Sequence, residues 1–133
     1  MRREIRISVI ICTYRAAQSI RQCLESLQAQ KSDCPFEVLV IDSSDDLTGK
    51  MVKEYFPDVR LYHFSKRMYC GEARNFGIER ARGEIVAFLD ADCTVSKNWV
   101  DRIMQSHQGE FGAIGGAIAN YQPSTSEGWA AYF

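Results

Sequence analysis

The sequence predicts an α/β fold with a mostly parallel sheet flanked by helices on both faces. Short apolar segments rich in β-branched residues alternate with segments whose apolar residues recur at helical spacing. Several of the apolar segments end directly in polar residues. In a parallel sheet these polar ends share one edge, where ligands usually bind. The 133 residues predict one domain, residues 1–133.

The first half of the chain predicts two strand–helix pairs. A buried strand is expected over 6–12, followed by a helix that ends near Gln30 and carries apolar residues at i, i+3, i+4 and i+7. A second strand is expected over 36–41. The acidic turn after it, 42–46, offers an N-cap to the next helix, and we expect Asp45 in this turn to be solvated. Pro57 should stop that helix.

The second half continues the alternation. A third strand is expected over 59–64, then a polar loop, a helix over 72–81 and a fourth strand over 84–89. Ser96 is expected to cap a further helix, and a Gly-rich fifth strand should follow over 111–119. Residues 126–133 resemble the start of another helix, with Trp129 and Phe133 on one face. That aromatic face has no obvious partner, so we expect the chain to be part of a longer protein.

The most informative feature is a pair of carboxylates, Asp90 and Asp92, at the end of the predicted fourth strand. In extended backbone, residues i and i+2 project from the same side, so the two acids should converge. Converging carboxylates repel each other unless a cation lies between them, and oxygen ligands suit Mg²⁺ or Mn²⁺. The alternative is that the pair caps the following helix, for which Thr94 and Ser96 are also available.

Charge and composition exclude several classes of function. The net charge is −1, with 16 basic and 17 acidic residues interspersed, so no surface for nucleic acid is predicted. No stretch approaches the roughly 20 apolar residues of a transmembrane helix, and no signal peptide is apparent, so we expect a cytoplasmic location. The five cysteines form no C-x-x-C pair, which indicates free, buried thiols in a reducing compartment.

Five ordered segments resemble family 2 glycosyltransferases, and the resemblance covers nearly the whole chain. They are residues 8–14, 24–30, 37–44, 71–84 and 88–92. The resemblance implies a GT-A fold, which is Rossmann-like and binds nucleotide-diphospho-sugars. It also implies that residues 1–133 are the N-terminal, donor-binding part of a longer catalytic domain.

The resemblance further implies an inverting, metal-dependent transfer of a sugar from a UDP-, dTDP- or GDP-sugar to a glycan or lipid-linked acceptor. Such transfers serve polysaccharide and cell-envelope synthesis. A location at the inner face of a membrane stays open, since parts of the protein outside this chain could hold it there. Asp92 would be the direct ligand of Mg²⁺ or Mn²⁺, and Asp90 would contact the ribose or, through water, the ion. The remaining donor-binding residues would be Thr13, Tyr14, Asp42, Arg74 and Ala91. The base that deprotonates the acceptor would lie beyond Phe133.

The residues leave other roles open: Tyr14 as packing, Asp42 as an N-cap, and Arg74 as the partner of Glu72 or Asp42. The chain departs from the family where Cys12 replaces proline, Arg15 replaces asparagine and Ser43 replaces an acid, which bears on base recognition.

A nucleotide-binding or regulatory module of the same fold, without transferase activity, is a different class of function. An acidic acceptor-side motif after Phe133 would exclude it. A phosphoacceptor receiver domain fits less well because Cys12-Thr13 stands where it needs an acidic pair. A dinucleotide-binding dehydrogenase would need a G-x-G-x-x-G after the first strand.

Overall fold

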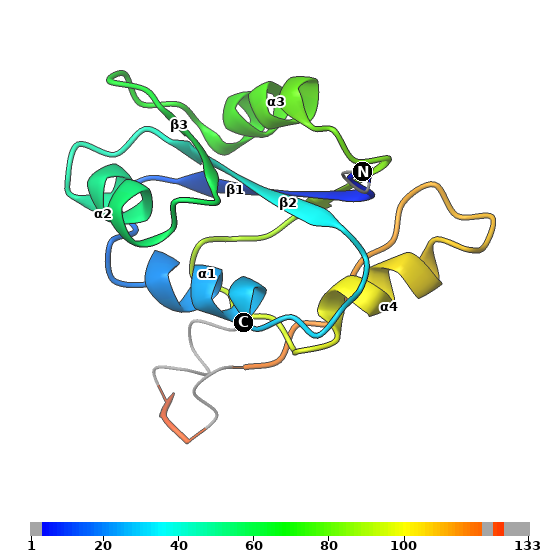
Figure 1. Ribbon diagram of the computed structural model, residues 1–133. Helices are drawn as coiled ribbons and strands as arrows, with labels where there is room; N and C mark the ends of the chain where they lie inside the picture. The colour runs from blue at the N-terminus through cyan, green and yellow to red at the C-terminus, as the bar shows by residue number, and fades with distance from the viewer. Residues whose placement is uncertain (1–3, 121–123, 127–133) are drawn as a thin grey trace.

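The computed structural model describes residues 4–120 and 124–126. Four strands form one parallel sheet in the order β3-β2-β1-β4 (Figure 1). The strands are β1 (Ile7–Thr13), β2 (Phe36–Asp42), β3 (Arg60–His63) and β4 (Ile85–Phe88). The helices are α1 (Ile20–Gln28), α2 (Thr48–Tyr55), α3 (Cys70–Arg80) and α4 (Trp99–Ser106). The predicted alternation of strands and helices is confirmed for these eight elements.

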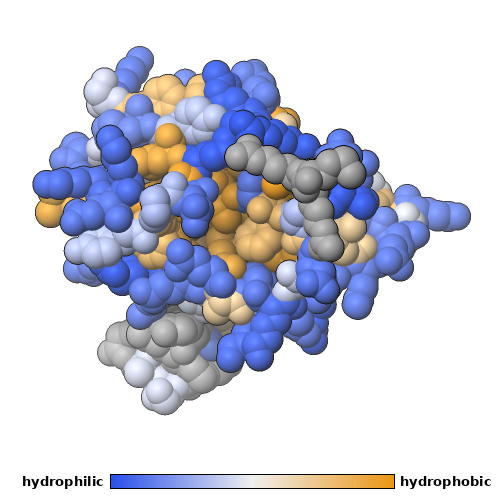
Figure 2. All heavy atoms as spheres, viewed as in Figure 1, coloured by the Kyte–Doolittle hydropathy of each residue, from blue (hydrophilic) through white to orange (hydrophobic). Residues whose placement is uncertain are grey.

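Helices cover both faces of the sheet, as the sequence predicts (Figure 1). Successive side chains of β1 point to opposite faces. Ile7, Val9 and Ile11 pack with α1, α2 and α4, whereas Ile10 packs with Ala73 of α3. Figure 2 shows apolar atoms in a hollow at the middle of the viewed face, framed by hydrophilic side chains.

The strand register aligns the ends of three strands. Thr13 of β1 is the register partner of Asp42 of β2, and Asp42 is in turn the partner of His63 of β3. All strand pairs are parallel, so the polar residues that follow each strand meet at one edge of the sheet.

Two expected features of local structure are wrong. Residues 111–119 form no strand, and Phe111 and Ile118 are 75% and 72% exposed. Glycine weakens an isolated strand, and none of the described strands pairs with this segment. Ser96 does not cap α4, whose N-cap is Asn98; instead, the Ser96 carbonyl accepts a bond from the Trp99 N–H at 3.0 Å.

The expected C-terminal helix falls mainly on residues 127–133, with Trp129 and Phe133, outside the described residues. Within the described part of the chain, no helix combines the length and the apolar character needed to cross a membrane.

Candidate functional site

The Asp42 carboxylate links the ends of three strands at the carboxyl edge of the sheet. It is 0% exposed. Its Oδ1 accepts hydrogen bonds from the hydroxyls of Thr13 at 2.7 Å and Ser44 at 2.6 Å. The Nδ1 atom of His63 lies 2.7 Å from Oδ2. Asp42 is therefore not the N-cap of α2, which begins after Leu47. His63 was missed by the sequence analysis because its proximity to Asp42 depends on the register between β2 and β3.

Close packing of α2 holds this group in place. A Cβ added at Gly49 would lie 2.6 Å from Oδ2 of Asp42 and 3.2 Å from Nδ1 of His63. Only a residue without a side chain lets the first turn of α2 approach the buried carboxylate so closely.

An aromatic and cationic group borders this edge. The Tyr14 ring lies beside two guanidinium groups, that of Arg67 at 4.1 Å and that of Arg15 at 5.2 Å from the ring centroid. Arg15 has a positive φ of 51° and makes two hydrogen bonds with Asp45, at 2.6 and 2.7 Å. The hydrogen bonds from Arg15 lower the pKa of Asp45 to about 2. Asp45 is exposed, as expected, but it is an ion-pair partner and not simply solvated.

The acidic pair lies just beyond β4. Single oxygen atoms of Asp90 and Asp92 and the sulfur of Cys93 all lie within 4.8 Å of one another. The backbone N–H of Cys93 donates to the carbonyl of Asp90 at 3.0 Å, which closes a turn across Ala91 and Asp92. The acids thus converge, but through a turn and not through the extended backbone that the sequence predicts. They do not cap α4, which begins only at Trp99.

Cys93 was also missed by the sequence analysis, although it directly follows the acidic pair. Its burial and the nearby carboxylates of Asp92 and Asp90 raise the pKa of its thiol. All five cysteines are free, as predicted, but only Cys23 is fully buried.

Arg74 connects α3 to the acidic pair. Its Nη2 donates to Oδ1 of Asp90 at 3.3 Å, and its guanidinium lies 5.4 Å from the Phe88 ring centroid. Its acidic partner is therefore Asp90, and not Glu72 or Asp42 as considered from the sequence.

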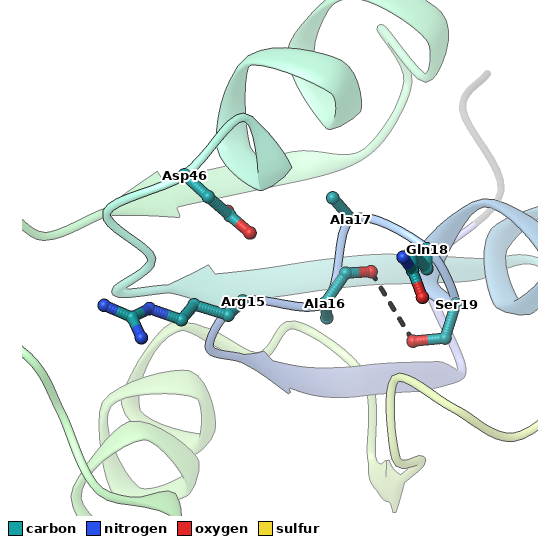
Figure 3. Close-up of a pocket in the computed structure, with 6 residues that line it drawn as sticks. All are labelled: Arg15, Ala16, Ala17, Gln18, Ser19 and Asp46. Carbon is teal, nitrogen blue, oxygen red and sulfur yellow. Dashed lines mark hydrogen bonds between the residues drawn. The ribbon is translucent and has the colours of Figure 1, made fainter.

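Two cavities lie near opposite edges of the sheet. One of about 360 Å³ borders the carboxyl edge and is lined by residues 15–19 and Asp46, with the Ser19 hydroxyl bonded to the Ala16 carbonyl (Figure 3). The acidic pair is not part of its lining. The other, of about 380 Å³, is lined by residues near the amino ends of β2 and β3, including Phe36 and Val59. Ligands of parallel α/β sheets bind at the carboxyl edge, so the first cavity is the one that adjoins the candidate site.

Curated proteins similar to this chain include several glycosyltransferases. The glycosyltransferase AglE of Haloferax volcanii is 31% identical over 89% of this chain and 41% of its own length. The putative glycosyltransferase EpsH of Bacillus subtilis is 30% identical over 86% of this chain and 33% of its own length. The chain therefore spans less than half the length of these relatives.

Solved glycosyltransferases share the fold. S. aureus TarS 1–349 in complex with UDP superposes with a TM-score of 0.70, at 26% identity, over 89% of this chain and 40% of that one. The mannosyltransferase PcManGT of Pyrobaculum calidifontis, in complex with GDP-Man and Mn²⁺, gives a TM-score of 0.60 at 34% identity, over 71% of this chain and 30% of that one. The GT-A fold predicted from the sequence is confirmed. The family model for glycosyl transferase family 2 matches residues 8–133, and the chain belongs to this family.

Proposed function

We propose that residues 1–133 are the nucleotide-sugar-binding part of an inverting glycosyltransferase that uses a nucleotide-diphosphate donor. The observation that carries this proposal is the convergence of Asp90, Asp92 and Arg74 at the carboxyl edge, on the same edge as the Asp42 group. Carboxylates for a divalent ion and a guanidinium for phosphate are the groups that a charged diphosphate donor requires. The similarity to TarS, solved with UDP-GlcNAc, supports this choice of donor class.

The donor set fits Mg²⁺ or Mn²⁺. Two carboxylates with ligand atoms within 4.8 Å of each other, both exposed, leave room for water and phosphate ligands. Asp92 would bind the ion directly, and Asp90 would contact it through water or hold the ribose. The ion would neutralise charge on the departing nucleoside diphosphate. Ala91, between the two acids, would let the donor approach the turn closely.

The base of the nucleotide would lie against the Tyr14 ring. Thr13 forms the adjacent wall, and Asp42 lies directly behind it, bonded to the Thr13 hydroxyl at 2.7 Å. The Asp42 carboxylate is fully buried, so we expect it to act on the base through Thr13 and His63, which it orients, and not by direct contact. This places aromatic surface and polar groups side by side, as base recognition requires.

Catalysis would need a base that deprotonates the acceptor hydroxyl, which we expect from residues beyond Phe133. A positioned general base contributes about 10²–10⁴-fold to a rate. The 133-residue chain alone should therefore bind donor but transfer sugar poorly. A glycan or lipid-linked acceptor is proposed for the whole protein.

Isothermal titration calorimetry of the chain with UDP, dTDP and GDP, with and without Mn²⁺ or Mg²⁺, tests the donor site. We expect binding of at least one nucleotide that requires the ion. Asp92→Asn should abolish this binding, whereas Asp58→Asn, an exposed acid near the opposite edge of the sheet, should leave it unchanged. Equally strong binding without any divalent ion would overturn the proposal.

A further inference from the structure

We infer that Arg74 is an exchangeable counter-ion of Asp90, which the divalent ion displaces and which then binds the diphosphate of the donor. This inference rests on the proposed function, because it assigns the order of events at the same site. The two carboxylates of the acidic pair lie close together, and Arg74 is the cation paired with one of them, at 3.3 Å from Asp90.

The contact between Arg74 and Asp90 is weak enough for another cation to replace the arginine. It consists of a single bond at 3.3 Å between side chains that are 41% and 66% exposed. The Arg15–Asp45 pair nearby makes two bonds, at 2.6 and 2.7 Å. An exposed pair contributes only about twofold to fivefold to an equilibrium, so a divalent ion can replace it.

The backbones on both sides of the contact are held in place, so the exchange involves the guanidinium alone. Ala73, next to Arg74, is buried against the sheet and fixes α3. The Asp90 carbonyl accepts bonds from the Cys93 N–H at 3.0 Å and the Cys23 thiol at 3.6 Å, which fixes the turn that carries the acidic pair. The long arginine side chain can rotate from this fixed base.

Arg74 therefore has opposite effects on binding in the absence and in the presence of nucleotide. Without nucleotide, Arg74 and the ion compete for the Asp90 carboxylate, so the arginine weakens ion binding. With a nucleoside diphosphate present, the displaced guanidinium can donate two parallel bonds to phosphate oxygens. Arg74 then strengthens nucleotide binding and couples it to the ion.

Arg74→Gln separates these two effects. Binding of Mn²⁺ alone is followed by the electron paramagnetic resonance signal of free Mn²⁺, and binding of UDP and GDP by calorimetry at saturating Mn²⁺. We expect the variant to bind Mn²⁺ alone about twofold to fivefold more tightly and the nucleotide about tenfold or more weakly. Arg80→Gln, which removes a charge from the last turn of the same helix, should change neither.

The outcomes distinguish this inference from the proposed function. Unchanged or weaker Mn²⁺ binding by Arg74→Gln overturns the counter-ion role, even where the wild-type chain binds UDP with Mn²⁺ as proposed. Tighter Mn²⁺ binding with unchanged nucleotide binding overturns the diphosphate role. If the wild-type chain binds no nucleotide, the proposed function fails, while the Mn²⁺ titrations still decide the exchange at Asp90. A lack of Mn²⁺ binding by both proteins overturns the exchange.

Discussion

Replacement of Gly83 by alanine tests how β4, and with it the acidic pair, is placed beside β1. Gly83 lies just before β4 and crosses the backbone of β1. A Cβ at this position would lie 2.7 Å from the Ile7 carbonyl carbon and the Ser8 nitrogen, and 2.9 Å from the Ile7 Cα. The Gly83 N–H also donates to the Ser8 hydroxyl at 2.9 Å. The obstructing atoms belong to a central strand and cannot rotate away.

The expected loss of stability follows from this contact. Overpacking of a well-packed interior costs about 1–3 kcal/mol, and because backbone atoms are the obstacle, we expect about 3 kcal/mol here. In a domain of this size each kcal/mol lowers the melting temperature by roughly 3–4 °C, which corresponds to about 10 °C.

Thermal and urea denaturation followed by circular dichroism measure the effect. Gly71→Ala is the matched control, since Gly71 lies in α3 and, apart from its chain neighbours and the backbone of its own helix, no atom lies within 4 Å of the added Cβ. Alanine favours helix over glycine by about 0.5–1 kcal/mol, so this variant should be as stable as the wild type or slightly more stable. A Gly83→Ala variant as stable as Gly71→Ala would refute the close approach of the two backbones.

Three other contacts can be tested by substitution or by chemical labelling. Burial alone would raise the pKa of Glu37, but hydrogen bonds from Ser8, the Arg82 N–H and Arg60 outweigh it and lower that pKa below 4.5. Glu37 therefore stabilises the fold above pH 4.5, and this contribution is lost as the pH falls through the folded pKa. Glu37→Gln should flatten the acid limb of stability against pH in urea titrations, and an unchanged slope would contradict the assignment. Thr13→Val should lower the free energy of unfolding by about 1.5–3 kcal/mol, because the Thr13 hydroxyl bonds to the buried Asp42 carboxylate. Thr94→Val, the same change at an exposed threonine, should alter that free energy by less than about 0.5 kcal/mol. Mn²⁺ with UDP should slow alkylation of Cys93, whose sulfur lies 3.8 Å from Asp92 Oδ1, but not of Cys34, as mass spectrometry of the labelled peptides would show. Equal protection of both thiols would speak against a site at the acidic pair.

Much of the fold could be predicted from the sequence because its signals are local. The apolar residues of α1 recur at helical spacing, and those of β1 form a short β-branched run, so each element was found within a few residues of its bounds. The expected fifth strand over 111–119 failed for the opposite reason. A strand is stable only when paired, and its neighbours cannot be read from its own residues.

The residues of the candidate site could be named from the sequence, but most of the contacts between them could not be predicted. The acids, Arg74, Thr13 and Asp42 were all named from motifs, and the structure places them along one edge. Their contacts were not predictable, because His63 reaches Asp42 through strand register and Arg15 reaches Asp45 across 30 positions of the chain. The roles of these residues in donor binding stay predictions until binding is measured.

The sequence by itself determined the α/β class, the order of the eight confirmed elements and the residue types available for chemistry, since these follow from short-range periodicity and motifs. Only the tertiary structure decided the strand order β3-β2-β1-β4, the burial of Asp42, and the partners of Arg74 and Cys93. The physical reason is that side-chain partners distant in sequence are chosen by packing and register. Those depend on every element of the sheet at once and leave little trace in any single segment of the chain.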